Sequence, residues 1–242
     1  MRIIKKNIKD VLGSIYYNFY KKNRINYGNR CLIYHAFGSK LEHDSYGISI
    51  SMKHFKEHIK YITDNYEICK INEIPTNRFC ISLSIDDGYK CTLDAISLLC
   101  NYDIHVTLFI TVDTLNKDQY LNNQDLISIS SLKNVSICSH GFTHNRLSEM
   151  QYNDQLKEIN DSKTILEKIT KNNIPGISFA HGSFNNDTMN ILKKSSYDFA
   201  ATSIKGINTN DMQKFLLRRN EIVSNDKICD LDKKIKGYYD YY

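Results

Sequence analysis

SLSIDDGYKCTLDAISLL, residues 82–99, joins a short apolar run to an amphipathic run and places two adjacent aspartates, Asp86 and Asp87, between them. The first run is typical of a buried strand, and the second repeats apolar residues at helical spacing. Like charges held together in a poorly solvated place raise each other's pKa and destabilise a fold. We therefore expect a positive group beside one carboxylate, and a metal ion is the leading candidate.

The same alternation of strand-like and helical runs continues on both sides of this stretch. Strands are predicted over 31–37, 66–71, 80–85, 105–110, 135–140, 176–182, 199–204 and 215–219. Helices are predicted over 51–64, 90–102, 148–170 and near 186–195. Strands that alternate with helices of this length indicate a parallel sheet with crossover connections. Because no glycine-rich dinucleotide fingerprint follows an early strand, we favour a distorted (β/α) barrel of about seven to eight strands over a doubly wound sheet.

Three of the predicted helices have recognisable start signals. Ser51 is placed to cap the helix over 51–64, and Asn185 precedes the helix near 186–195. Ser148 and Gln151 have the spacing of a capping box, which predicts that the helix over 148–170 begins there.

Length and charge divide the chain into a large domain, residues 30–242, and a basic amino-terminal segment, residues 1–29. A chain of 242 residues is long enough for one large core. In the segment, Ile4, Ile8, Leu12, Ile15 and Phe19 recur at helical intervals among lysines and arginines, including Lys5, Lys6 and Arg24. Such an amphipathic helix either covers part of the barrel or lies in an anionic membrane interface. The formal charge of +5 is too mild, and too evenly mixed elsewhere, to indicate nucleic-acid binding.

The compartment is predicted from the cysteines and from hydropathy. The seven cysteines form no CxxC pair and are expected to be thiols, mostly small buried apolar groups, in a reducing compartment. No apolar run approaches the roughly 20 residues of a spanning helix. We predict a cytoplasmic protein, with peripheral contact to the inner membrane left open, and a carboxyl-terminal GYYDYY that forms a loose surface end.

Two histidines extend the metal hypothesis. The stretch ICSHGFTHNRLSEM, residues 137–150, holds His140 at the end of a predicted strand and His144 four residues later, on a helical or tight-turn spacing that points both the same way. With one aspartate they complete a site of the His₂-carboxylate kind, which leaves positions on the ion for water and substrate. In a barrel the carboxyl ends of the strands share one mouth, so these side chains can meet there with His35 and His181.

The two aspartates then have separate roles. If Asp87 binds the metal, Asp86 is free to accept a proton from the attacking water. Gly88 allows a sharp turn after the pair.

At this point the sequence resembles the polysaccharide deacetylase family, the NodB-homology or carbohydrate esterase family 4 enzymes. SIDDGY stands where that family has TFDDG, SHGFTH is similar to its histidine motif, and LIYHAF with SMKHFKEHIKYITDNYEI resembles the start of members from polysaccharide gene clusters. The resemblance covers about residues 31–222. It implies a distorted barrel, a divalent metal that is usually zinc, ligands Asp87, His140 and His144, and Asp86 as the base. Arg219 in FLLRRNEI resembles the arginine that orients the base, with Arg218 as an alternative.

The chain departs from the family pattern at two motifs. RxPxG appears as SFAHG, residues 178–182, where Ser178 replaces arginine and Ala180 replaces proline. The backbone N–H at His181 can still stabilise an oxyanion. The LxH histidine, the family's general acid, is missing, because no histidine follows His181.

These departures leave several functions open. The prediction is removal of an acetyl group, chiefly N-acetyl, from a sugar in bacterial surface polysaccharide or glycolipid assembly. His181 or His35 would replace the acid. The alternatives are an O-acetyl ester substrate, a slow or inactive enzyme, a catalytically degenerate glycan-binding relative, and a deformylase or other amide hydrolase acting on a lipid-linked sugar.

Overall fold

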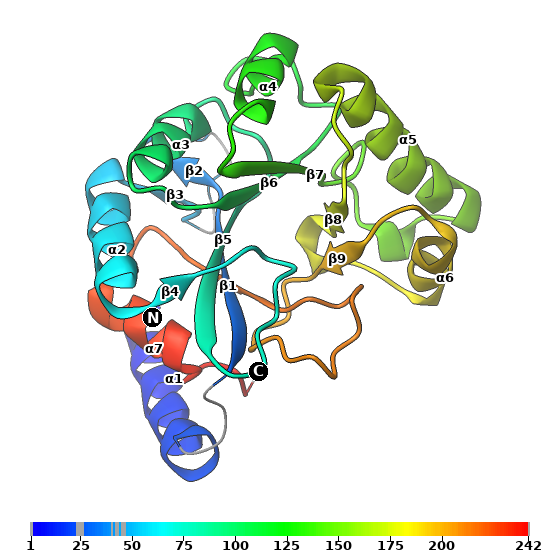
Figure 1. Ribbon diagram of the computed structural model, residues 1–242. Coiled ribbons are helices and arrows are strands. Elements are labelled where there is room, and N and C mark those ends of the chain that lie inside the picture. The colour runs from blue at the N-terminus through cyan, green and yellow to red at the C-terminus, as the bar shows by residue number, and fades with distance from the viewer. Residues whose placement is uncertain (1, 23–26, 40, 42–43, 45–46, 242) are drawn as a thin grey trace.

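Seven parallel strands form a nearly closed ring in the computed structural model, which describes residues 2–22, 27–39, 41, 44 and 47–241 (Figure 1). Their order is β10-β1-β5-β6-β7-β8-β9, and the short β4 pairs with the start of β5. A parallel bridge between Ala201 and Leu217 joins β9 to the chain just before β10, so the two ends of this order meet. The predicted barrel of about seven to eight strands is therefore confirmed.

The strands of the ring differ in length, and β1 and β5 are the longest. The strands are β1 (Gly28–Tyr34), β2 (Ala36–Phe37), β3 (Ser49–Ile50), β4 (Glu67–Ile68), β5 (Phe79–Ile85), β6 (Val106–Ile110), β7 (Val135–Ser139), β8 (Gly176–Ser178), β9 (Phe199–Ala201) and β10 (Arg219–Glu221). Only β2 and β3 lie outside the large sheet, as a separate parallel pair among the described residues.

Helices connect and cover the strands. They are α1 (Arg2–Tyr16), α2 (Met52–Asn65), α3 (Thr92–Asn101), α4 (Asn123–Ser130), α5 (Tyr152–Thr170), α6 (Asn186–Lys194) and α7 (Ile228–Lys236). Short turns of other helical types are η1 (Tyr17–Lys21), η2 (Leu147–Glu149) and η3 (Ala180–Gly182). The helices α4 and α7 were not predicted from the sequence.

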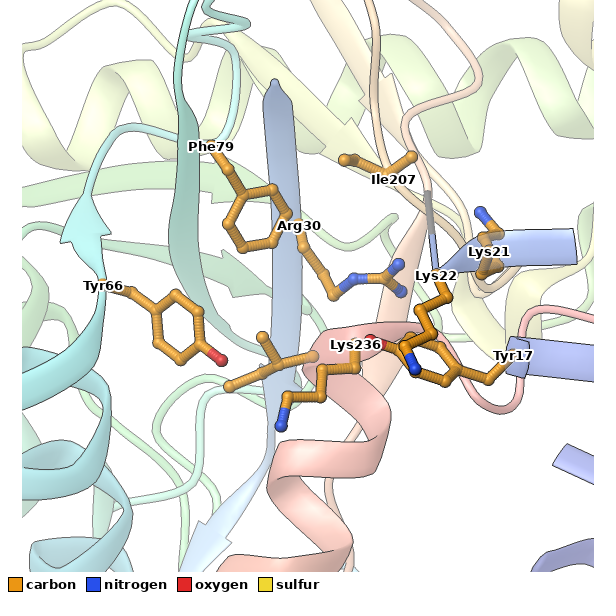
Figure 2. Close-up of a pocket in the computed structure, with 9 residues that line it drawn as sticks. Tyr17, Lys21, Lys22, Arg30, Tyr66, Phe79, Ile207 and Lys236 are labelled. Atoms are coloured by element: carbon orange, nitrogen blue, oxygen red, sulfur yellow. The ribbon is translucent and has the colours of Figure 1, made fainter. Parts of the chain in front are cut away.

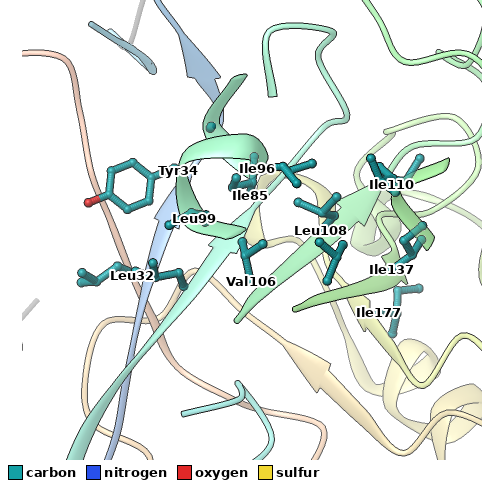
Figure 3. Packing of buried hydrophobic residues seen from close by; sticks show 14 of the residues in the cluster. Leu32, Tyr34, Ile85, Ile96, Leu99, Val106, Leu108, Ile110, Ile137 and Ile177 are labelled. Atoms are coloured by element: carbon teal, nitrogen blue, oxygen red, sulfur yellow. The ribbon is translucent and has the colours of Figure 1, made fainter. Parts of the chain in front are cut away.

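Alternate side chains of each strand enter two different apolar cores. One lies between the sheet and the helices, where Leu32 and Val106 pack near Ile96 and Leu99 of α3 (Figure 3). Burial of such a side chain contributes about 1.5–3 kcal/mol. The other core fills the inside of the ring and is smaller, comprising Cys31, Ile71, Phe109, Cys138, Phe199, Ala201 and Leu217. On β5, the inward positions are polar: Ser82, Ser84 and then Asp86.

The helix start signals are confirmed at two positions and wrong at one. Ser51 Oγ accepts a hydrogen bond from the His54 amide, and Asn185 forms a capping box with Thr188. Ser148 does not cap α5, because its hydroxyl binds Ser183 Oγ at 2.7 Å and residues 147–149 form a separate 3₁₀ turn. The helix therefore begins at Tyr152.

Two expectations about cysteines and the carboxyl-terminal tail are wrong. Cys69 and Cys80 form a disulfide rather than two thiols, at the point where β4 pairs with β5.

The carboxyl-terminal tail is not loose. Tyr239 is buried, and both carboxylate oxygens of Asp240 accept hydrogen bonds from Arg30 of β1, each at 2.8 Å. Packing of its aromatic side chains on Tyr16 of α1 and Tyr17 of η1 compensates for the entropy of ordering a chain end.

The Arg30–Asp240 pair predicts a pH-dependent contribution to stability. Burial alone would raise the pKa of Asp240, but hydrogen bonds and charge from Arg30 and Lys21 lower it to about 2. Because this folded-state pKa lies below the unfolded value of about 3.9, the pair stabilises the fold above pH 4 and its contribution disappears as the pH falls toward 2. We expect Asp240→Asn to lower the free energy of unfolding at pH 7 by about 2 kcal/mol.

Urea denaturation at pH 7 and at pH 3 measures this effect. The difference between wild type and Asp240→Asn should shrink at the lower pH. Asp64→Asn is the control, because Asp64 pairs with Lys60 on the exposed face of α2 and should change stability by less than about 0.5 kcal/mol. An equal loss for both variants would contradict the proposed importance of the buried pair.

Candidate metal centre

The predicted site residues lie at the carboxyl ends of neighbouring strands. Asp86 and Asp87 follow β5, His140 follows β7, His35 follows β1, and His181 lies in η3 after β8. Because the ring strands are parallel, these ends form one rim.

Two of these side chains, Asp87 and His140, meet the predicted ligand His144 closely enough to share an ion. Ligand atoms of Asp87, His140 and His144 all lie within 4.8 Å of one another. Asp87 Oδ1 is 3.1 Å from His144 Nε2 and 3.4 Å from His140 Nε2. One carboxylate oxygen and two imidazole nitrogens are a donor set suited to zinc and similar divalent ions, with positions left for other ligands. The residues present therefore fit such an ion.

Asp87 is kept ionised in this position. Burial alone would raise its pKa, but hydrogen bonds from His140 and His144, with the charge of His35, hold the pKa well below its usual range. An ionised carboxylate is the form that binds a cation.

The backbone at the site adopts uncommon conformations. Asp87, His144 and His181 have φ values of 74°, 66° and 56°, in the left-handed region that favours glycine. Each costs on the order of 1 kcal/mol, and such strain tends to occur at functional sites. Gly88, at φ 84°, completes the sharp turn that was expected after the aspartates.

The tautomer of His140 is fixed by the strand next to it. His140 Nδ1 lies 3.1 Å from the Ser178 carbonyl oxygen and also contacts Ser178 Oγ. Since a carbonyl can only accept, Nδ1 carries a proton. Nε2 is the nitrogen that faces Asp87, to which it donates here, and it is the one that would bind an ion after loss of that proton. Ser178 was noted in the sequence only as a departure from a motif, and this contact gives it a positioning role.

The loop that carries His144 is held by Glu158 of α5. The Phe142 amide donates to Glu158 Oε2 at 2.8 Å, and the Thr143 amide and hydroxyl donate to the same carboxylate at 2.9 and 2.7 Å. His140 lies at a strand end and His144 in the loop that follows it. Of the two arrangements predicted from their spacing, the tight turn is therefore found and the helix is not. Sequence reasoning missed Glu158, because a glutamate on a helix gives no signal of its distant partners.

Asp86 forms a buried ion pair inside the ring. Arg219 donates to both its oxygens, from Nη1 at 2.7 Å and from Nη2 at 2.8 Å. Burial alone would raise the pKa of Asp86, but Arg219 and His140 lower it below its usual range. Of the two predicted arginines, Arg219 contacts Asp86, whereas Arg218 binds Asn208 and the Lys205 carbonyl oxygen.

Two more histidines lie at the same rim. The His181 ring packs edge-on against His144, with ring centroids 4.7 Å apart, and its side chain is exposed. Burial of part of the ring and the charges of His144 and Arg146 lower its pKa. His35 is half-buried, and its Nδ1 is a buried atom with no hydrogen-bond partner among the described residues.

A family model and a curated relative both identify the chain as similar to polysaccharide deacetylases. A family model described as "Polysaccharide deacetylase" matches residues 73–200, slightly more than half of the chain. The Bacillus subtilis protein named "Putative polysaccharide deacetylase YxkH" is 24% identical over 199 residues, which are 78% of this chain and 69% of that protein.

Solved structures share the fold. The polysaccharide deacetylase BC0361 from Bacillus cereus superposes with a TM-score of 0.77 at 22% identity, over 87% of this chain and 69% of that one. The Streptococcus pyogenes deacetylase PplD, in complex with acetate, has a TM-score of 0.76 at 20% identity, over 87% and 99%.

Metal analysis of the purified protein tests the candidate centre. We expect about one zinc or similar divalent ion per chain, and loss of that ion in Asp87→Ala and in His144→Ala, because each variant removes one of only three ligand side chains. His181→Ala is the matched control, since His181 touches His144 but is not among the ligand atoms, and it should keep the ion. Unchanged metal content in both ligand variants would exclude this site.

Proposed function

The chain belongs to the polysaccharide deacetylase family, and from this premise we propose that it is a metal-dependent hydrolase that removes an acetyl group, chiefly N-acetyl, from a sugar. The observation that supports the proposal most is the pairing of two differently supported carboxylates. Asp87 faces the two histidines, whereas Asp86, beside it, is held by Arg219. One is placed to bind an ion, and the other to move a proton.

The residues of the rim would divide the reaction between them. A divalent ion held by Asp87, His140 and His144, which we propose is zinc, would polarise the acetyl carbonyl and activate water. Asp86, ionised and fixed by Arg219, would accept the proton of that water. The backbone N–H of His181 is proposed to stabilise the negative charge that develops on the acetyl oxygen. The leaving amine then needs a proton from a nearby acid.

We propose His35 as that acid, with His181 as the alternative. The Asp86 amide donates to the Tyr34 carbonyl oxygen at 3.0 Å, so His35 follows β1 directly beside the base. The His35 ring is half-buried, and its Nδ1 has no hydrogen-bond partner among the described residues, so no hydrogen bond at that atom holds the ring in another role. His181 is more exposed, and its ring packs against His144 rather than beside Asp86.

A polar cavity beside the rim is suited to a carbohydrate. It has a volume of about 380 Å³ and is lined by Asn145, Arg146, Glu149, Met150 and His181. Amide and charged groups of this kind can hydrogen-bond sugar hydroxyls. We therefore propose an acetylated amino-sugar glycan or a lipid-linked sugar as substrate, in bacterial surface polysaccharide or glycolipid synthesis.

The location in the cell is part of this proposal and rests on the sequence. We propose the cytoplasm, although the disulfide between Cys69 and Cys80 is a bond more usual in oxidising compartments. Fractionation of the host cells decides this point, and recovery outside the cytoplasmic and inner-membrane fractions would contradict it.

Acetate release from acetylated amino-sugar oligomers tests the activity. The metal-loaded protein should release acetate, and Asp86→Asn should keep its metal but lose about 10²–10⁴ in kcat, because the proton acceptor is removed. Since this variant also takes a charge from the buried pair with Arg219, circular dichroism checks that it is folded. Metal binding without acetate release from any polymeric or lipid-linked glycan would instead support the non-catalytic glycan-binding alternative. That alternative is motivated by SFAHG at residues 178–182 and by the absence of a histidine after His181.

Separate glutamine variants identify the acid. We expect His35→Gln to lower kcat for N-acetyl substrates by about 10²–10⁴ and His181→Gln to lower it by less than about tenfold. Both variants should retain the metal, which metal analysis checks. An activated O-acetyl ester, whose leaving group needs less protonation, should rescue His35→Gln. The reverse ranking of the two variants would assign the acid to His181.

A further inference from the structure

The amino-terminal helix contacts the rest of the molecule through a face that is not its apolar face. A Cβ added to Gly13 would lie 2.7 Å from the Tyr238 carbonyl oxygen, and the Tyr17 and Tyr238 rings stack with centroids 4.2 Å apart. Asp10 accepts hydrogen bonds from Lys233 and Tyr239. The inward side of α1 and η1 is therefore small, aromatic and polar.

The apolar residues of this helix point outward. Ile8, Val11, Leu12, Ile15 and Phe19 have exposed fractions of 54, 59, 49, 50 and 78%. Their intervals of three and four residues place them along one stripe, which we call the α1 stripe. The predicted residue Arg24 and the side chains of Ile4, Lys5 and Lys6 lie outside the described part of the structure. Single exposed apolar residues are ordinary, whereas a continuous stripe of this size marks an interaction surface.

A cationic pocket lies at the carboxyl-terminal end of the same helix (Figure 2). Its volume is about 260 Å³, and its walls are Tyr17, Lys21, Lys22, Arg30, Tyr66, Phe79, Ile207, Ile235 and Lys236. None of these nine residues is acidic.

Two carboxylates behind the pocket neutralise only part of its charge. Asp240 pairs with Arg30 and lies 3.1 Å from Lys21 Nζ, and Asp232 pairs with Lys236. Four cations against two carboxylates leave an excess of two positive charges. A phosphate group, with oxygens that accept hydrogen bonds from lysine and arginine, is the natural ligand for such a pocket.

We propose that residues 8–22 form a peripheral binding face for an anionic lipid bilayer, with the α1 stripe in the interface and a lipid phosphate in the cationic pocket. Amphipathic helices with aromatic and aliphatic residues on one face and lysines beside them bind in this way. Each lysine near an anionic surface adds about 1 kcal/mol. No helix among the described residues is long and apolar enough to span a membrane.

The charge of the amino-terminal helix favours an anionic bilayer, rather than a second copy of the chain, as the partner of the α1 stripe. Asp10 is the only acidic residue in the sequence from Arg2 to Lys22, and it faces inward toward Lys233. Two such faces packed together would bring lysines together without carboxylates to pair them. An anionic bilayer supplies the missing negative charge.

The position of this face leaves the rim accessible. Arg30 and Phe79 lie at the amino ends of β1 and β5, whereas Asp87 and His140 lie beyond the carboxyl ends of the strands. The pocket and the candidate metal centre are therefore at opposite ends of the barrel. Binding to lipid through the first would not cover the second.

Vesicle co-sedimentation of the full chain tests the proposal. We expect binding to vesicles of equimolar phosphatidylcholine and phosphatidylglycerol, and at least tenfold weaker binding to phosphatidylcholine alone. The double variant Val11→Glu with Ile15→Glu should lower the partition coefficient at least about tenfold. Lys22→Ala and Lys236→Ala should each lower it about fivefold.

Matched controls separate this face from general hydrophobicity and charge. Ile127→Glu removes an exposed apolar residue from α4, and Lys133→Ala removes an exposed lysine elsewhere; both should bind within about twofold of wild type. Failure of wild type to bind anionic vesicles, or equal losses in test and control variants, would overturn the proposal. A dimer in light scattering that the stripe variant abolishes would also overturn it, because a second copy would then cover the stripe.

Discussion

The ion pair between Arg219 and Asp86 is the constraint on which both the ring and the site depend. The two side chains have exposed fractions of 0 and 4%, and removal of two charges from water is costly unless their hydrogen bonds are satisfied. Arg219 meets this condition by binding both Asp86 oxygens, Ser84 Oγ and the Thr202 carbonyl oxygen. Since Asp86 follows β5 and Thr202 follows β9, one guanidinium links well-separated parts of the ring.

The same pair explains how two neighbouring aspartates can both stay ionised. Their side chains do not share one environment, because strand alternation directs Asp86 into the ring and the left-handed turn at Asp87 directs the second carboxylate toward the histidines. Arg219 compensates the first charge within the protein. The second carboxylate is contacted by the imidazoles of His140 and His144, and a bound cation would compensate its charge.

The sequence predicted the parts of the site that follow from strand ends and missed the parts that depend on packing between distant elements. Asp87 and His140 were predictable because parallel strands place their carboxyl ends together, and apolar runs mark those ends. Glu158 and Ser178 were not assigned roles, since nothing local to α5 or β8 shows which loop or ring they will contact. The expectation of a loose tail was wrong for the same reason: residues 237–241 are held by contacts with Arg30 and Tyr17, which lie far away in the sequence.

No histidine follows His181, but the order of the strands shows that a general acid could come from an earlier part of the chain. In a nearly closed parallel ring, position along the chain does not determine position around the rim. The first strand, β1, lies between β10 and β5, so its end is next to Asp86 although the two are far apart in the sequence, as the register pair Tyr34 and Ile85 shows. Because β1 is paired with β10, a residue that follows β1 lies close to a residue that follows β10. A proton donor at either position could therefore reach the same part of the rim. The role that we propose for His35 requires this placement, and its Nδ1 has no hydrogen-bond partner within the described part of the chain.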